Sequence, residues 1–267
     1  MTHHFDDAIS LAPRGEGVMT GATSPAYANF IGPYGGITAA QVLNAVLQDP
    51  RRVGDPVALT VNYAAALADA AFSAHARPAR TNRSTQHWIV ELRQGDETMI
   101  VATVMTAVRR DTWSGHEAHP PEVPPPADVP RTPRQRVEWL NRYDTRFITG
   151  LMPRHWEGQG GAESLTRLWV RDEPLRPLDF ASLTAMADIF FPRLWLRRAT
   201  QTPIGTVTMT VYYHADAAQL AATGTDYLLA QAKGQGFRKG YFDHAGQLWN
   251  EAGELLATTH QAVYYKE

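Results

Sequence analysis

Two polar residues in the C-terminal half of the chain stand in apolar surroundings and could act on a bound molecule. Asp188 lies in "LTAMADIFFP", and this pattern predicts a position in the middle of an apolar helix. Gln261 lies in "ELLATTHQAVYYKE", whose composition predicts a half-buried final strand. A buried carboxylate needs hydrogen-bond donors, and an unpaired buried amide costs roughly 1–3 kcal/mol. A carboxylate held by such donors can take a proton from a water molecule, which is general-base chemistry.

The pattern leaves an alternative open for each residue. The face of the final strand that carries Gln261 is no more apolar than the opposite face, so alternation alone does not say which side is buried. Gln261 would then be a solvated residue of an edge strand, and Asp188 an exposed helix residue.

Other kinds of chemistry find little support. The chain has no cysteine, which excludes disulfides, thiolate nucleophiles and cysteine metal sites. Its ten histidines lack ligand spacing on any one element, so we predict no metal site. Nucleotide-binding, α/β-hydrolase and zincin motifs are missing, and we predict no cofactor.

Composition describes a globular protein of 267 residues with 44% hydrophobic and 19% charged residues. No apolar run approaches the roughly 20 residues that span a bilayer, so we expect no membrane span. The start "MTHHFDDAIS" lacks a basic leader and an apolar core, and we therefore expect a cytoplasmic location without a signal peptide. A formal charge of −2 argues against nucleic acid as a partner, despite local clusters such as "RPARTNRS".

The chain contains an internal repeat. "ATVMTAV" (102–108) and "ATTHQAV" (257–263) agree at four of seven positions with an offset of 155 residues. "VALTVNY" (57–63) and "VTMTVYY" (207–213) agree at four of seven with an offset of 150 residues. Two matches at nearly the same offset indicate a duplicated unit.

Each copy reads as strand-like segments, a helix and about four antiparallel strands. The helices lie in "GPYGGITAAQVLNAVLQ" and "PLDFASLTAMADIFFPRLW". Further strand-like segments in the second copy span 142–148 and 163–171. The four strands of each copy are predicted at 57–66, 70–79, 84–94 and 98–109, and at 204–214, 226–234, 236–244 and 254–265.

The repeat and its composition also predict the domains. We expect an N-terminal unit over 1–112, an extended Pro-rich linker over 113–135, and a C-terminal unit over 136–267 that carries the polar pair.

This duplicated unit, an apolar helix after a Gly-rich turn followed by long antiparallel strands, resembles the acyl-CoA thioesterase II family. The resemblance implies an α+β double hotdog, in which each of two repeats wraps a curved antiparallel sheet around a central helix. It also implies an acyl-CoA substrate, hydrolysis without a cofactor, and a homodimer or homotetramer. The family's catalytic aspartate, threonine and glutamine match Asp188, Thr206 in "GTVTMTVYYH" and Gln261. Thr206 and Gln261 would orient the water that Asp188 deprotonates.

The glycine pair Gly35 and Gly36 is the best candidate for backbone N–H donors to an oxyanion, because a helix start has free donors and glycine permits close approach. Glycines that serve only the turn are the alternative. Ser84 in "TNRSTQHW" matches a glycine-serine turn of the family and is a second candidate for substrate binding.

The repeat offers an internal control. By its offsets Gln261 corresponds to Thr106 and Asp188 to Gln41, so the first copy lacks the catalytic set. One site per chain is therefore expected. Two other functions stay open: a non-catalytic acyl-CoA binding hotdog protein, and a hotdog enoyl-CoA hydratase, for which neither copy has the required Asp/His pair.

Overall fold

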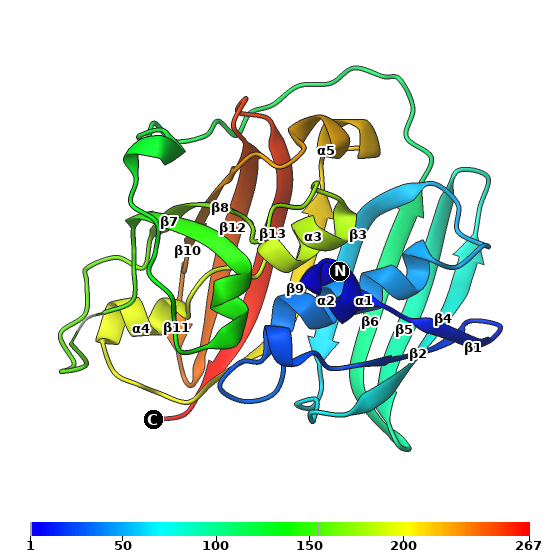
Figure 1. The fold of residues 1–267 in the computed structure, drawn as a ribbon, viewed down its shortest axis with the longest axis horizontal. Helices are drawn as coiled ribbons and strands as arrows, with labels where there is room; N and C mark the ends of the chain where they lie inside the picture. The colour runs from blue at the N-terminus through cyan, green and yellow to red at the C-terminus, as the bar shows by residue number, and fades with distance from the viewer. Residues whose placement is uncertain (1, 154) are drawn as a thin grey trace.

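Two helices, α2 (Gly35–Leu47) and α3 (Phe180–Met186), lie next to each other on one face of a single large antiparallel sheet (Figure 1). The structure is a computed structural model that describes residues 2–153 and 155–267. Within those ranges the strands form one path in the order β1-β2-β4-β5-β6-β3-β9-β13-β12-β10-β8-β7, with β11 paired to β12. None of the helices in these ranges is both long and apolar enough to cross a membrane.

The N-terminal half contains helices α1 (His4–Ile9) and α2 and a short 3-10 helix, η1 (Pro25–Tyr27). Its strands are β1 (Ala12–Gly15), β2 (Val18–Ala22), β3 (Asp55–Tyr63), β4 (Ala71–Thr81), β5 (Thr85–Gln94) and β6 (Glu97–Ala107).

The C-terminal half contains helices α3, α4 (Arg193–Arg198) and α5 (Ala217–Thr223), preceded by the 3-10 helices η2 (Pro126–Asp128) and η3 (Glu138–Arg142). Its strands are β7 (Tyr143–Thr149), β8 (Thr166–Asp172), β9 (Ile204–Tyr213), β10 (Leu228–Lys233), β11 (Phe237–Arg238), β12 (Tyr241–Asn250) and β13 (Leu255–Tyr265).

Helix α2 is buried on all sides because sheet, α3 and the N-terminal segment surround it. Its residues from Gly36 to Val46 are buried, and most are small or aliphatic. Two of the buried polar side chains donate to the N-terminal segment: Gln41 Nε2 to the carbonyl of Ala8 at 2.7 Å, and Asn44 Nδ2 to that of Ile9 at 2.7 Å. These hydrogen bonds therefore hold α1 against α2.

The sequence predicted the strands well, with one exception. Each of the eight strand ranges predicted for the two copies overlaps an observed strand, as do the two strand-like segments at 142–148 and 163–171. The range 236–244 is wrong in its extent, because Lys239 and Gly240 have positive φ and form a turn between β11 and β12. β12 therefore begins only at Tyr241 and continues to Asn250.

The two halves are joined through their backbones. β3 pairs with β9 in the middle of the sheet, so a continuous ladder crosses from one half to the other. Thr60 lies opposite Thr210, and their hydroxyl oxygens are 3.0 Å apart. This junction places the end of β3 beside the beginning of β9.

The Pro-rich connection crosses from one half to the other along the edge of the molecule (Figure 1). Residues 108–137 contain no strand and only the short helix η2. Val129 packs with Trp169 and Trp249 in a small apolar cluster, and Trp169 Nε1 donates to the Pro124 carbonyl at 2.9 Å. The connection therefore covers the outer face of β8, β10 and β12.

Main-chain hydrogen bonds show how the halves correspond. The Ala64 N–H donates to the Met99 carbonyl at 3.0 Å, and the His214 N–H donates to the Leu256 carbonyl at 2.9 Å. β9 therefore follows β3 by 150 residues, as predicted, whereas β13 follows β6 by 157 residues and not by 155.

This register changes the counterpart of Gln261. Leu59 pairs with Val104 in the N-terminal half where Met209 pairs with Gln261 in the C-terminal half. The counterpart is Val104, and the prediction of Thr106 is wrong by two residues. A shift of two keeps every side chain on its own face of a strand, so short matches between strand sequences do not exclude it.

One carboxylate is buried at a distance along the sheet from the β3–β9 pairing. Asp172 at the end of β8 is 2% exposed, and its Oδ2 accepts a hydrogen bond from Ser182 Oγ at 2.5 Å. Its Oδ1 has no hydrogen-bond partner among the described residues. Burial raises the pKa of Asp172 to about 6, against the hydrogen bond from Ser182 and the charge of Arg176.

Asp172→Asn tests this burial. An acid with a raised folded-state pKa destabilises the fold when it ionises, so stability is lost as pH rises from about 4 to about 6. As pH rises from about 4 to about 6, the wild type should lose on the order of 2 kcal/mol of unfolding free energy relative to Asp172→Asn, which has no charge at this position. Urea unfolding at several pH values measures the difference, with Asp96→Asn in the exposed β5–β6 turn as the control. A difference independent of pH would contradict the interpretation.

Candidate functional site

The structure brings Asp188, Thr206 and Gln261 together at the inner face of the sheet. Gln261 Nε2 donates to Asp188 Oδ1 at 2.6 Å, and Thr206 Oγ1 donates to Gln261 Oε1 at 3.3 Å. The two bonds fix the amide orientation, because its oxygen meets a donor and its nitrogen meets a carboxylate. Gln261 is 4% exposed, so it is not the solvated residue of the alternative interpretation.

Asp188 lies after α3 and not in the middle of a helix as predicted. α3 ends at Met186, and the Asp188 N–H donates to the carbonyl of Ala185 in a tighter turn. The Ile189 N–H donates to the Met186 carbonyl in the same way. The tighter turn places the partly buried aspartate at the end of α3, where it faces α2.

Thr206 reaches the inner face through a β-bulge in β9. Thr208 pairs with Ala262 and Thr206 pairs with Val263, which leaves Val207 as an extra residue. In a regular strand, with Val207 in the ladder, alternation would place Thr206 on the outer face together with Thr208. The bulge is therefore what lets the Thr206 hydroxyl meet Gln261.

The glycine pair brings the two helices close at this point. A Cβ at Gly35 would lie 2.8 Å from Asp188 Oδ2, and one at Gly36 would lie 2.5 Å from the Ala185 carbonyl oxygen. The Gly36 N–H, in the first turn of α2, stabilises the charged form of the nearby Asp188 carboxylate and lowers its pKa. The role of Gly35 and Gly36 as donors to a substrate oxyanion stays a prediction.

Burial dominates the electrostatics of Asp188. It raises the pKa of this carboxyl to about 7, and the hydrogen bonds from Gln261 and Gly36 oppose the rise. A carboxyl with such a pKa is ionised in a large fraction of molecules near neutral pH and is still basic enough to accept a proton.

Two tyrosines that the sequence reasoning missed complete the surroundings. Tyr63 Oη donates to the Gly35 carbonyl at 2.9 Å, and Tyr34 Oη donates to the Ala185 carbonyl at 2.6 Å. Burial, with Asp188 next, raises the pKa of both phenols well above the usual value. Tyr63 had a signal in the repeat, because both "VALTVNY" and "VTMTVYY" end in tyrosine.

Ser84 lies outside this cluster. It occupies the turn between β4 and β5, where its carbonyl accepts from the Val108 N–H at 2.9 Å. This turn is beside the beginning of β3, because the end of β6 pairs with Asp55. Thr206 lies beyond the opposite end of β3, where Asn62 pairs with Thr208. The nine-residue strand separates the two positions by roughly 25 Å.

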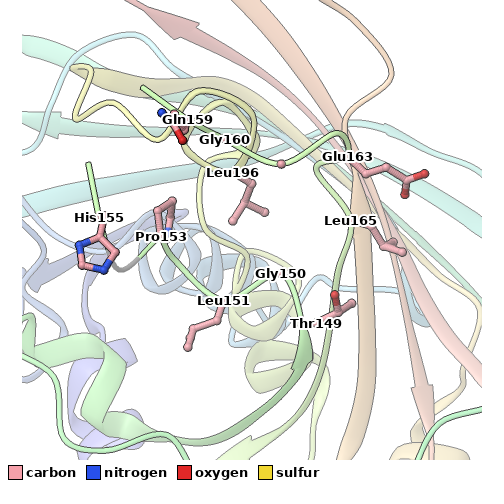
Figure 2. Close-up of a pocket in the computed structure, with 11 residues that line it drawn as sticks. Thr149, Gly150, Leu151, Pro153, His155, Gln159, Gly160, Glu163, Leu165 and Leu196 are labelled. Atoms are coloured by element: carbon pink, nitrogen blue, oxygen red, sulfur yellow. The ribbon is translucent and has the colours of Figure 1, made fainter. Parts of the chain in front are cut away.

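A surface pocket in the described part of the chain is a separate feature. It has a volume of about 480 Å³ and opens between the segment 149–165 and α4 (Figure 2). Leu151, Pro153, His155 and Leu196 are among its lining residues, and the three clustered residues are not. Among the described residues, no group of three or more His, Asp or Glu side chains could hold a metal ion.

A second cleft lies closer to Asp188. It has a volume of about 450 Å³, with Tyr143, Phe147 and Phe191 among its lining residues and Arg131 and Arg134 also bordering it. Asp188 contributes to the raised pKa of Tyr143, which burial causes in the main. The cleft therefore approaches the candidate site through an aromatic wall.

Comparison with known proteins agrees with this architecture. The family model of the acyl-CoA thioesterase N-terminal domain matches residues 24–109, and that of the acyl-CoA thioesterase C-terminal domain matches residues 117–265. Among curated proteins none matches this chain.

Solved structures show the same fold. A conserved protein of unknown function with a hot dog fold from Alicyclobacillus acidocaldarius is 44% identical, with a TM-score of 0.95 over 100% of this chain and 99% of that one. A putative thioesterase II from Thermobifida fusca is 18% identical, with a TM-score of 0.82 over 99% and 98% of the chains. The acyl-CoA thioesterase II TesB2 from Mycobacterium marinum is 18% identical, with a TM-score of 0.77 over 98% of both chains. The predicted α+β double hotdog is confirmed.

Gly36→Ala tests the close approach of the helices. The new methyl group would meet the Ala185 carbonyl oxygen and the Tyr34 ring, so α2 and α3 must separate. We expect a loss of about 2 kcal/mol in unfolding free energy, typical of an overpacked contact. Urea unfolding measures it, with Gly15→Ala as the control because nothing lies within 4 Å of that Cβ. Equal stability of the two variants would show that the helices do not depend on the glycine.

Proposed function

Because this chain belongs to the acyl-CoA thioesterase family, we propose that it hydrolyses an acyl-CoA thioester to the free acid and CoA, with Asp188 as general base. The observation that carries the proposal is the hydrogen-bonded series from Thr206 through Gln261 to Asp188, next to the first turn of α2. Gln261 of the C-terminal half and Gly36 of the N-terminal half both stabilise the charged form of this carboxylate.

In the proposed reaction Asp188 removes a proton from a water molecule while the water oxygen attacks the thioester carbonyl carbon. The carbon–sulfur bond then breaks, and the proton passes from Asp188 to the departing CoA sulfur. No covalent enzyme intermediate forms. Gln261, held by Thr206, keeps the carboxylate in one orientation, which favours attack from a fixed direction.

The developing oxyanion needs donors at the same place. The first-turn N–H groups of α2 at Gly35 and Gly36 suit this role, because they are free of helix partners and carry the positive end of the helix dipole. When Asp188 accepts the proton from water it loses its charge. Its hold on the Gly36 N–H then weakens as the charge on the substrate oxygen grows.

The cleft bordered by Arg131 and Arg134 suits the CoA part of the substrate. Guanidinium groups bind phosphates through charge-assisted hydrogen bonds. Both arginines are exposed, and so in part are Glu173 and Glu138, with which they form ion pairs, so a phosphate can compete with these two glutamates. Arg131 also lies 3.7 Å from the buried Asp144 carboxylate. The aromatic side of the cleft leads toward Asp188.

Asp188→Asn and Thr206→Val test the catalytic assignment. Thiol release from short, medium, long and aromatic acyl-CoAs measures turnover. We expect Asp188→Asn to lower kcat by roughly a hundredfold or more, the scale of a general base. Thr206→Val should lower it by about tenfold, because Gln261 loses one of two orienting bonds. Thr208→Val, on the outer face of the same strand, is the control and should match the wild type.

The outcomes separate the alternatives. A wild-type protein that binds acyl-CoAs and releases no thiol would replace hydrolysis with a binding function. Turnover untouched by Asp188→Asn would place the site elsewhere.

The pH dependence of kcat/KM reports the base directly. Since Asp188 acts as the carboxylate and burial raises its pKa, the rate should rise with pH through about 7 and level off above it. Gln261→Leu removes a bond that lowers this pKa, so its rising limb should move to higher pH. A limb near pH 4 in the wild type would contradict the assignment of Asp188.

A further inference from the structure

A polar wall lies beside Asp188 on the inner face of β12 and β13. We use this term for His244, Thr259 and Gln261, with Gly246 between them. His244 pairs with Gln261 across the two strands, and Gly246 pairs with Thr259. Directly opposite residues have Cβ atoms about 4.5–5.5 Å apart. The wall therefore continues from the amide that holds the carboxylate.

Two polar groups of the wall are buried and form no hydrogen bond with the described residues. His244 is 2% exposed and Thr259 is 3% exposed. His244 Nε2 and Thr259 Oγ1 have no hydrogen-bond partner among the residues that the structure describes. Leaving such a group unpaired costs roughly 1–3 kcal/mol. Burial also lowers the pKa of His244, so its ring is neutral near pH 7 and offers one donor and one acceptor.

The N-terminal half shows that the fold does not require this polarity. By the register of the strands, His244, Gly246, Thr259 and Gln261 correspond to Trp88, Val90, Ala102 and Val104. All four of those residues are apolar and buried.

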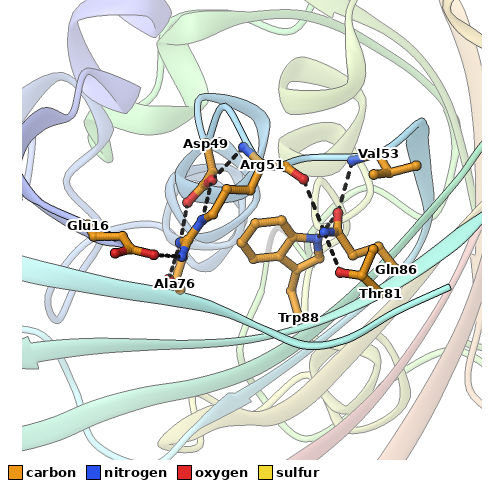
Figure 3. Close-up of polar contacts among 8 residues, drawn as sticks. All are labelled: Glu16, Asp49, Arg51, Val53, Ala76, Thr81, Gln86 and Trp88. Carbon is orange, nitrogen blue, oxygen red and sulfur yellow. Dashed lines mark hydrogen bonds and ion pairs between the residues drawn. The ribbon is translucent and has the colours of Figure 1, made fainter.

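The one polar atom of that apolar set is paired. Trp88 Nε1 donates to Gln86 Oε1 at 3.0 Å, and Gln86 Nε2 donates to the Arg51 carbonyl (Figure 3). The same place in the sheet is thus fully packed in one half and polar in the half that carries Asp188.

The ring of Phe190 packs against the polar wall. Its ring stands at 86° to the His244 ring, with the centroids 5.4 Å apart. A Cβ at Gly246 would lie 3.0 Å from Phe190 Cε2, so glycine makes room for this ring. His244 lies opposite Gln261, which holds Asp188, so the wall is within reach of an acyl group whose carbonyl carbon is attacked at Asp188.

We infer that the polar wall selects acyl groups that carry a hydroxyl oxygen within the first few carbons of the thioester, bound by His244 Nε2 and Thr259 Oγ1. A hydroxyl both donates and accepts, which matches a neutral imidazole beside a threonine hydroxyl. The inference rests on the proposed function, because it places the acyl group where Asp188 acts.

Binding of two thioether analogues that cannot be hydrolysed tests the wall without turnover. Isothermal titration calorimetry compares S-(3-hydroxybutyl)-CoA with S-butyl-CoA on the wild-type protein. We expect the hydroxylated analogue to bind at least about tenfold more tightly, the effect of one well-formed hydrogen bond to a buried group. Thr259→Val and His244→Leu should each bring the affinity ratio toward one. The ratio is read on a single protein sample, so a loss of stability affects both analogues alike.

The control is Thr258→Val, which changes the neighbouring residue on the other face of β13, where its hydroxyl meets His214. It should keep the wild-type ratio. Equal affinities in the wild type, or a preference that survives both wall variants, would overturn the inference. A clear preference together with no thiol release from butanoyl-CoA or 3-hydroxybutanoyl-CoA would support the wall and overturn the proposed hydrolysis.

Discussion

The close approach of two helix ends is the constraint on which the rest of the structure depends. The first turn of α2 and the last turn of α3 meet at Gly35 and Gly36, where any side chain would collide with Asp188 or with the backbone before it. Donors of the N-terminal half thereby reach a carboxylate of the C-terminal half. The pairing of β3 with β9 holds both halves in this relation. Burial at the contact gives Asp188 its raised pKa, and the hydrogen bonds there keep it from rising further.

The duplication shows which parts of the unit are architecture and which are specialised. The register of strand pairing, including the irregularity between Leu92 and Arg93 and that between Leu248 and Trp249, recurs in both halves. The side chains differ at the four matched inner-face positions described above. Tryptophan and aliphatic residues fill the N-terminal sheet where a histidine, a threonine and a glutamine face the core of the C-terminal sheet. Packing accounts for the former set, whereas the latter set includes the two groups that we propose bind an acyl hydroxyl.

The sequence predicted the fold and the identity of the clustered residues, and it failed where local geometry decides. Alternation and turn residues place strands well, because a half-buried strand has a strong two-residue period. The bulge at Val207 leaves no mark in that period, so the face of Thr206 could be inferred only through the resemblance. The end of α3 at Met186 likewise leaves no mark in the sequence, because the apolar run continues to Phe191. Ser84 was chosen from a short sequence pattern. That pattern does not show that its turn lies beside the beginning of β3, at the opposite end from Thr206.

The single chain that links the two halves has an evolutionary consequence. In a dimer of identical subunits, every substitution appears twice, so a site residue cannot be exchanged for tryptophan or valine in one subunit alone. The connection over residues 108–137 removes this restriction. Each half can then accumulate its own substitutions while the shared ladder between β3 and β9 preserves their fit. Asymmetry of function thus becomes available to an architecture that is close to twofold symmetric.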